Sequence, residues 1–227
     1  MSRLTVVMYH YVRDLSRSKY PGIKGLDLKL FLEQIQYLKK YYQIIRMEDL
    51  LENLNTGKPL PPRALLLTFD DGYKDHFSNV TPALVKNGIQ GTFFVSARAM
   101  AEKIVLDVNK IHYVLACVKD KSTLLHEIDR MIREEAYPAD MEAYMTRIND
   151  GGENERRYDE KEVVLIKDLL QKGLSVNLRG RIIGALFEKY ISRNQEEFAN
   201  DLYLGRQDLS AMMDEEMFIG SHGYDHV

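Results

Sequence analysis

The feature that most constrains this chain is a nearly continuous apolar run from Ala64 to Phe69, which reads ALLLTF. A strand that is apolar at successive positions buries both of its faces, which is typical of a parallel sheet covered by helices. Shorter apolar runs at Leu4–Met8 (LTVVM), Thr92–Val95 (TFFV) and Met217–Ser221 (MFIGS) predict further strands. We therefore expect an α/β domain with a parallel sheet.

Helical segments separate the first of these strands. From Leu28 to Tyr42, apolar side chains recur at three- and four-residue steps, which predicts a helix with one apolar face. The sequence also indicates a short strand at Gln43–Ile45, a helix at Glu48–Leu54, and a helix from Pro82 to Asn87 that ends at Gly88. Repeated βα units of this kind are typical of a (β/α) barrel or a doubly wound sheet.

The pattern changes after Met100, where apolar stripes at helical spacing follow one another up to residue 214. Such stripes are more typical of helix packing than of cofactor binding. We interpret residues 101–214 as a helical insertion. The α/β domain would then consist of residues 1–100 and 215–227.

Composition and charge argue against several classes of function. The chain of 227 residues has 31 Lys and Arg against 34 Asp and Glu, so nothing indicates the positive surface that nucleic acid requires. A single cysteine, Cys117, forms no internal disulfide and no multi-cysteine zinc site. No apolar run reaches membrane-spanning length, and the N-terminal run is too short for a signal-peptide core. We expect a cytoplasmic protein without a nucleic-acid partner or membrane span.

Two short motifs carry potential chemistry. The first, Asp70-Asp71-Gly72, follows the most apolar strand. Adjacent carboxylates repel and suggest a bound cation, although the same residues are ordinary turn composition. In the second motif, His222 and His226 follow the last strand and have a spacing that lets two imidazoles reach one metal. Two surface histidines in a loop would show the same spacing.

The position of both motifs strengthens the metal interpretation. The carboxyl ends of parallel strands meet at one edge of a sheet, so motifs that follow two such strands are expected to converge. One aspartate and two histidines leave coordination positions open for water and substrate. The pattern therefore indicates a catalytic rather than a structural metal site.

These motifs resemble those of the polysaccharide deacetylases of carbohydrate esterase family 4, also called the NodB homology domain. The first motif of that family, TFDDG, is present without change at Thr68–Gly72. Its second, His-(Ser/Thr)-x-x-His, is similar to His222–His226, with Gly223 in the Ser/Thr place. The Tyr9-His10 pair and the GTFFV segment at Gly91–Val95 also look like this family. The resemblance implies a partial (β/α) barrel of the NodB type with a large helical insertion.

The resemblance also implies roles for individual residues: Asp70 as general base, and Asp71, His222 and His226 as ligands of a divalent metal. Zinc is the first expectation, with cobalt, nickel, manganese or iron as alternatives. The implied reaction is hydrolysis of an N-acetyl group on an amino sugar or polysaccharide, in which a metal-activated water attacks the amide carbon.

Two further residues are candidates for contact with substrate. His10 follows the first strand, where a hydrogen-bonded histidine at a strand end is an equal alternative, and Tyr73 follows the Asp-Asp-Gly turn. The three other histidines of the chain are His76, His112 and His126. They have no partner at metal-ligand spacing, and we expect them on the surface or on helices.

Part of the family pattern cannot be placed on this chain: a base-orienting arginine, a groove segment and a Leu-x-His general acid. Residues 1–100 and 215–227 amount to about half of the roughly 200 or more residues of a complete barrel. We therefore expect a truncated catalytic domain whose open sheet edge favours a homo-oligomer. Two alternatives stay open, a catalytically incomplete metal-binding or assembly module and a metal hydrolase that acts on another amide or ester.

Overall fold

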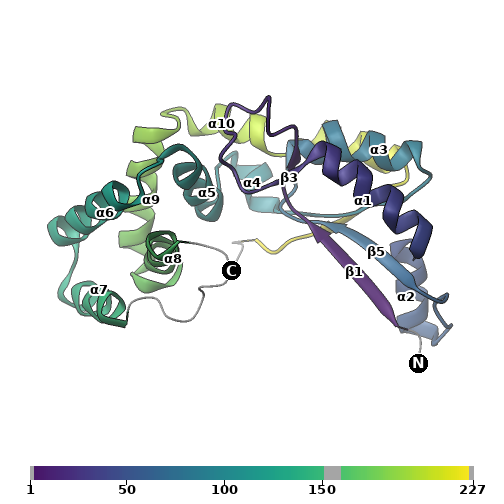
Figure 1. Cartoon of the computed structure of the whole chain (residues 1–227), viewed down its shortest axis with the longest axis horizontal. Coiled ribbons are helices and arrows are strands. Elements are labelled where there is room, and N and C mark those ends of the chain that lie inside the picture. Colours follow the sequence, from purple (N-terminus) through teal and green to yellow (C-terminus); the bar gives the residue numbers. More distant parts are fainter. Residues whose placement is uncertain (1–2, 151–159, 225–227) are drawn as a thin grey trace. The chain divides into compact units, whose positions relative to one another are not determined.

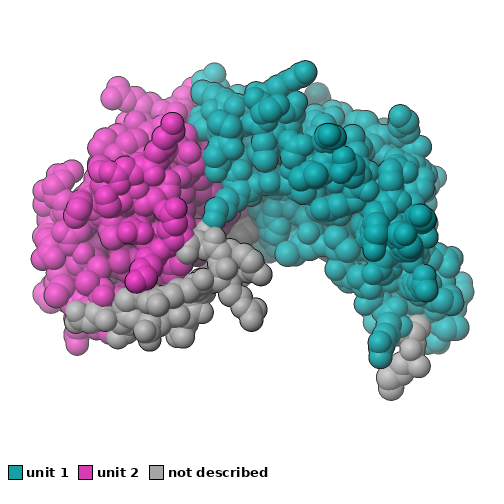
Figure 2. Space-filling view, viewed as in Figure 1, with its two compact units in different colours: residues 1–104, 196–227 teal, residues 105–195 magenta. Residues whose placement is uncertain are grey.

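The computed structural model describes residues 3–150 and 160–224. They fall into two compact units, which Figure 2 colours separately. Unit 1 contains Met1–Ile104 and Glu196–Val227, and unit 2 contains Val105–Gln195. Unit 1 therefore takes in residues 196–214, which we had expected in the helical insertion. Among the helices of the described residues, none has the length and apolar character needed to cross a membrane.

A parallel sheet forms the centre of unit 1 (Figure 1). In the described residues it has five strands, with the order β1 (Leu4–Tyr9), β5 (Ala64–Phe69), β6 (Thr92–Val95) and β7 (Phe218–Ser221), and with β4 (Gln43–Ile44) paired to β5. Every pairing in this sheet is parallel. The α/β class with a parallel sheet is thereby confirmed, and no closed barrel forms among the described residues.

Strand β5 is buried along its whole length, as its apolar sequence predicts. One face presents Leu65, Leu67 and Phe69. These side chains share a core with buried residues of α1 (Leu28–Tyr41), α3 (Thr81–Lys86) and α11 (Arg206–Asp214). On the opposite face of β5, Leu66 and the first residue of the strand, Ala64, form a second apolar cluster with Ile45. The strand is therefore covered on both sides, and its carboxyl end has a fixed position.

Capping and apolar spacing explain where the helices of unit 1 form. Helix α1 begins after Asp27, whose carboxylate accepts the Lys29 N–H at 2.9 Å, and it buries one apolar stripe. Helix α2 (Met47–Thr56) ends at Gly57, which adopts a left-handed conformation. A π-helical turn, η1 (His76–Val80), precedes α3 and was not predicted.

The remaining elements of unit 1 are short. Two residues each form the strands β2 (Val12–Arg13) and β3 (Leu26–Asp27), which pair in parallel as a separate small sheet. Helix α4 (Ala97–Glu102) follows β6, and α10 (Gln195–Leu202) precedes α11. Between α10 and α11, the Leu204 N–H donates to the Gly72 carbonyl at 2.8 Å, so this late segment is tied to the turn after β5.

Unit 2 is entirely helical in its described residues. Its elements are α5 (Asp107–Cys117), α6 (Lys121–Glu135), α7 (Pro138–Asp150), α8 (Lys161–Asp168), η3 (Leu169–Gly173) and α9 (Val176–Tyr190). One apolar core joins all of these helices, with Leu124, Ile128, Ile132 and Ile182 fully buried. The apolar stripes of the sequence are therefore helix-packing faces, as predicted.

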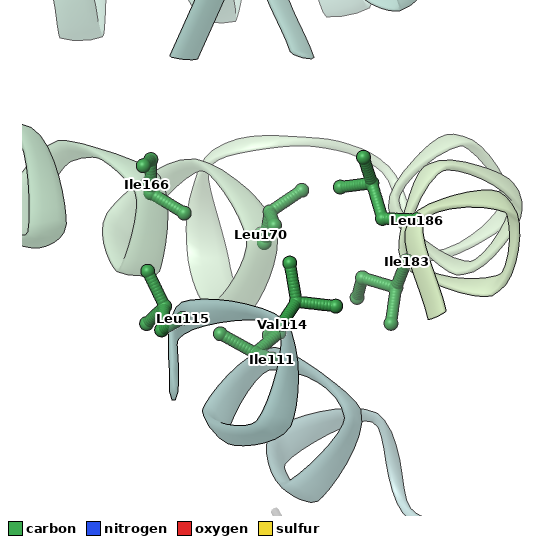
Figure 3. Close-up of a pocket in the computed structure, with 7 residues that line it drawn as sticks. All are labelled: Ile111, Val114, Leu115, Ile166, Leu170, Ile183 and Leu186. Atoms are coloured by element: carbon green, nitrogen blue, oxygen red, sulfur yellow. The ribbon is translucent and has the colours of Figure 1, made fainter. Parts of the chain in front are cut away.

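This helical core contains a small cavity of about 10 Å³ (Figure 3). Its lining is entirely aliphatic and comes from α5, α8, η3 and α9: Ile111, Val114, Leu115, Ile166, Leu170, Ile183 and Leu186. A hole of this size holds at most about one water, and an apolar lining gives a water no hydrogen bonds. The cavity is therefore a packing defect rather than a ligand site.

Filling this cavity should stabilise unit 2. Val114→Ile adds one methylene at the cavity wall, and we expect a gain of about 0.5–1 kcal/mol in the free energy of unfolding. Val176→Ile makes the same chemical change at an exposed position of α9 and should alter stability little. Urea unfolding followed by far-ultraviolet circular dichroism measures both. A destabilised Val114→Ile would mean that the cavity cannot accept the methylene.

Candidate functional site

The residues singled out in the sequence follow the carboxyl ends of parallel strands. Asp70 follows β5, His222 follows β7 and His10 follows β1. Backbone hydrogen bonds to the neighbouring strand continue past two of these ends. The Asp70 N–H donates to the Tyr9 carbonyl at 2.9 Å, and the His222 N–H donates to the Val95 carbonyl at 3.0 Å. Hydrogen bonds of the sheet therefore fix the backbone of Asp70 and His222.

The turn after β5 is conformationally unusual. Asp71 and Gly72 both adopt positive φ, 72° and 68°. Aspartate tolerates this region better than most residues, and glycine enters it without steric cost. At Gly72 a second constraint applies, because a Cβ atom there would lie 2.7 Å from Cγ1 of Val95. The backbone therefore requires glycine at position 72 and favours an aspartate at position 71, independently of any chemistry.

This turn brings Asp71 towards His222. The Oδ1 atom of Asp71 lies 3.4 Å from Nε2 of His222, although the two residues are far apart in the sequence. Asp71 is almost completely buried, whereas about a third of the His222 side chain is exposed. Asp70 is also buried and directly precedes Asp71. The structure therefore brings together the first motif and the first histidine of the second.

Tyr73 supports the Asp71 carboxylate from the protein interior. Its hydroxyl donates a hydrogen bond to Oδ2 of Asp71. Burial raises the pKa of Tyr73 well above its usual value, so the phenol keeps its proton and stays the donor. The ring is fully buried and stacks on Tyr11, with centroids 4.0 Å apart. Tyr73 thus lies behind the carboxylate, and not in an open cleft where we had expected it to contact substrate.

The other candidate for substrate contact, His10, has an exposed side chain, and its backbone carbonyl has a structural role. Nε2 of His76 lies 2.8 Å from this carbonyl oxygen. His76 is completely buried and contacts the rings of Phe69, Tyr73 and Phe93. Our expectation of a surface or helical position for His76 is therefore right about the helix, since His76 starts η1, and wrong about the surface.

Burial also determines the protonation state of His76. It lowers the pKa of His76 to about 4, so the ring is neutral at neutral pH and Nε2–H donates to the His10 carbonyl. One sequence feature points to a role of His76 near the site, namely its position shortly after the Asp-Asp-Gly turn. Without a spacing partner, however, the residue could not be distinguished from a surface histidine.

The described residues fit a metal only in part. In residues 3–150 and 160–224, no three His, Cys, Asp or Glu side chains gather as a metal site, and His226 lies outside these ranges. For the two expected ligands that are described, Asp71 and His222, the distance can be compared with that of a metal site. Ligand atoms at about 2.1 Å from a tetrahedral zinc lie about 3.4 Å from each other. The separation of Asp71 Oδ1 and His222 Nε2 has this value, so the pair fits a shared divalent cation.

Comparison with known proteins gives a family match for one segment. Residues 57–150 match the family model described as polysaccharide deacetylase. The chain is 42% identical over 80 residues to poly-beta-1,6-N-acetyl-D-glucosamine N-deacetylase of Escherichia coli (strain K12), which is 34% of this chain and 12% of that protein. It is 26% identical over 103 residues to YxkH of Bacillus subtilis (strain 168), a provisionally named polysaccharide deacetylase, covering 45% of this chain and 35% of that protein.

Among solved structures, a de-N-acetylase from Aggregatibacter actinomycetemcomitans has a TM-score of 0.39 at 22% identity, covering 43% of this chain and 39% of that one. IcaB from Ammonifex degensii has a TM-score of 0.35 at 27% identity, covering 44% and 42%. The chain thus spans less than half the length of these four relatives.

The buried histidine gives a prediction about pH. The folded-state pKa of His76, about 4, lies below the unfolded value of about 6.5, so only the unfolded chain takes up this proton between these values. The contribution of His76 to the free energy of unfolding should be fully present above pH 6.5. It should be lost as the pH falls from 6.5 to 4, by about 3 kcal/mol. His76→Gln keeps a donor for the His10 carbonyl but does not titrate, so its stability should depend less on pH.

Urea unfolding of both proteins at pH 7.5 and 4.5, followed by near-ultraviolet circular dichroism of the tyrosines, measures this difference. Nitrogen NMR of the imidazole provides a direct check, because the His76 ring should stay neutral at pH 5.5. Equal pH dependence in wild type and His76→Gln, together with a protonated ring at pH 5.5, would contradict the prediction.

Proposed function

We propose that this chain is a polysaccharide deacetylase that hydrolyses N-acetyl groups on amino sugars with the help of a divalent metal. The match of residues 57–150 to the polysaccharide deacetylase family model supports this proposal. One observation carries the proposal: Asp71 Oδ1 and His222 Nε2 approach to 3.4 Å at the carboxyl ends of β5 and β7, directly beside the buried carboxylate Asp70. Asp71 and His222 would then be two metal ligands, and Asp70 would be the base beside them.

Asp71, His222 and His226 are the residues that would hold the metal. The chemistry supplied by a divalent cation at such a position is a lower pKa of a bound water and a polarised acetyl carbonyl. One carboxylate with two imidazoles suits zinc first and cobalt, nickel, manganese or iron as alternatives. Tyr73 orients the Asp71 carboxylate through its hydroxyl, and the backbone bond to Val95 orients His222.

Asp70 acts as the general base in this proposal. Its carboxylate takes a proton from the attacking water while the water oxygen bonds to the amide carbon. The carbon–nitrogen bond then breaks, the nitrogen takes up a proton, and the products are acetate and a free amine on the sugar. Burial of Asp70 keeps solvent away from the carboxylate that must accept the proton.

The substrate is proposed from the relatives. The Escherichia coli relative is named for poly-β-1,6-N-acetyl-D-glucosamine, so this polymer is the first substrate to test. The other two readings have distinct outcomes. Bound metal without acetate release would favour a metal-binding or assembly module, and turnover only on other amides or esters would favour a different hydrolase.

Location and assembly remain predictions as well. We propose a cytoplasmic location, which cell fractionation tests. We also propose that two copies associate through the edge strand β1, where the Val6 and Met8 side chains are more than half exposed.

The base role predicts the behaviour of Asp70→Asn. The variant should bind zinc like the wild type, because Asp70 is not among the proposed ligands. Acetate release from poly-β-1,6-N-acetyl-D-glucosamine should fall about 10²–10⁴-fold, since an amide cannot accept the proton. Isothermal titration with zinc and an enzymatic acetate assay measure the two effects. Asp107→Asn, an exposed carboxylate on α5, is the matched control and should change neither value. An unchanged rate in Asp70→Asn would remove Asp70 from the role.

The support from Tyr73 gives a second prediction. Tyr73→Phe removes only the hydroxyl that donates to Asp71, and zinc affinity should fall about 10–100-fold while the fold is kept. The matched control is Tyr9→Phe, since the Tyr9 hydroxyl donates to Gln34 Oε1 at 3.0 Å and does not contact the proposed ligands. Isothermal titration compares the three proteins. Equal affinity in all of them would show that the Tyr73 hydroxyl does not position the carboxylate.

A further inference from the structure

Unit 1 contains a cavity of about 500 Å³ that the proposed reaction does not use. Small-molecule sites usually have volumes of roughly 300–1,000 Å³. Part of its wall is apolar, and this part is contributed by Ala99, Met100, Tyr203 and Leu204. Three cationic side chains, Lys74, Lys103 and Arg206, complete the lining together with small and polar residues. An apolar wall with charged groups around it is typical of a site for a small amphipathic ligand.

The cavity lies next to the turn that carries the proposed ligand Asp71. Lys74 directly follows Tyr73, the residue that donates to Asp71. The Tyr203 ring stacks on the Tyr73 ring with centroids 6.1 Å apart and an interplanar angle of 14°. The Leu204 N–H donates to the Gly72 carbonyl at 2.8 Å. The cavity therefore adjoins the turn that positions Asp71.

The charged side chains that line the cavity are all cationic. None of the residues that line it is acidic. Lys74 is paired with Asp208 at 2.5 Å, and Lys103 with Glu196 at 2.8 Å. An ammonium has three donors, so each lysine keeps hydrogens for a ligand.

Arg206 is the cation that the ligand would use first. It is exposed, and it forms no ion pair within residues 3–150 and 160–224. Its guanidinium offers five donors in a planar fork that suits carboxylate and phosphate oxygens. The cavity thus has one cation, Arg206, that no described carboxylate neutralises, and two paired lysines with hydrogens left for a ligand, which favours an anionic ligand.

We infer that this cavity binds a sugar unit that carries an anionic group, a carboxylate or a phosphate, next to the N-acetylated unit. The inference rests on the proposed function, and it predicts that an acidic polysaccharide binds more tightly than the neutral poly-β-1,6-N-acetyl-D-glucosamine. The apolar wall takes the carbon face of the sugar ring. Arg206, Lys74 and Lys103 take the anionic oxygens through charge-assisted hydrogen bonds.

Binding of short saccharides, measured by isothermal titration without any turnover, tests the inference. The probes are a glucuronic acid–N-acetylglucosamine disaccharide, N-acetylglucosamine 6-phosphate, neutral N,N′-diacetylchitobiose and inorganic phosphate. At least one anionic sugar should bind about tenfold or more tightly than the neutral disaccharide and than phosphate alone. The tighter of the two anionic sugars identifies the anionic group.

Variants localise the effect. Arg206→Gln and Lys103→Gln should each remove most of the preference for the anionic sugar. Arg193→Gln, which deletes an exposed cation in unit 2, should keep it. Equal binding of neutral and anionic sugars, binding of inorganic phosphate as tight as that of the sugar phosphate, or an equal loss in Arg193→Gln would each overturn the inference.

The two proposals can fail separately. Acetate release with no preference for anionic sugars would refute only the cavity assignment. Anionic sugar binding that Arg206→Gln abolishes, in a protein without zinc binding or acetate release, would refute only the deacetylase.

Discussion

The site depends on one constraint, the burial of β5 on both faces of the parallel sheet. Because Leu65 and Leu67 face one core and Leu66 the other, the strand can neither slip in register nor tilt without exposing apolar surface. Its carboxyl end is therefore rigid, and the Asp70–Gly72 turn starts from a fixed backbone. Positive φ at two successive residues is tolerated there because the packed strand and the bond from Leu204 hold both sides of the turn.

The sequence predicts the parts of this arrangement that are local. Apolar runs indicate the strands, and the rule that parallel strands end at one edge of a sheet predicts that Asp71 and His222 lie close together. The approach of these side chains to 3.4 Å agrees with that expectation. The roles of Asp70 as base and of Asp71, His222 and His226 as metal ligands remain predictions, and His226 lies outside the described residues.

What the sequence could not predict depends on contacts between distant segments. Residues 196–214 have the same apolar stripes as the helices before them, so periodicity alone cannot separate α11, which packs on the sheet through Met212, from the helices of unit 2. Tyr73 reads as an exposed residue after a turn, and only its stack between Tyr11 and Tyr203 reveals that it faces inward. The burial of His76 likewise requires aromatic rings from two different strands, which no local pattern announces.

The electrostatics of the turn connect stability with function. Two neighbouring carboxylates are buried here, Asp70 at 8% and Asp71 at 2% exposure, and like charges with little access to water raise the free energy of the folded chain. The Tyr73 hydroxyl offsets part of this cost, but a neutral donor cannot cancel the repulsion. The divalent cation of the proposed function would cancel it, and a cation that binds only the folded form at 100 times its dissociation constant would stabilise the fold by about 2.7 kcal/mol. The turn at which two carboxylates are buried is thus also the place where the proposed metal would stabilise the fold.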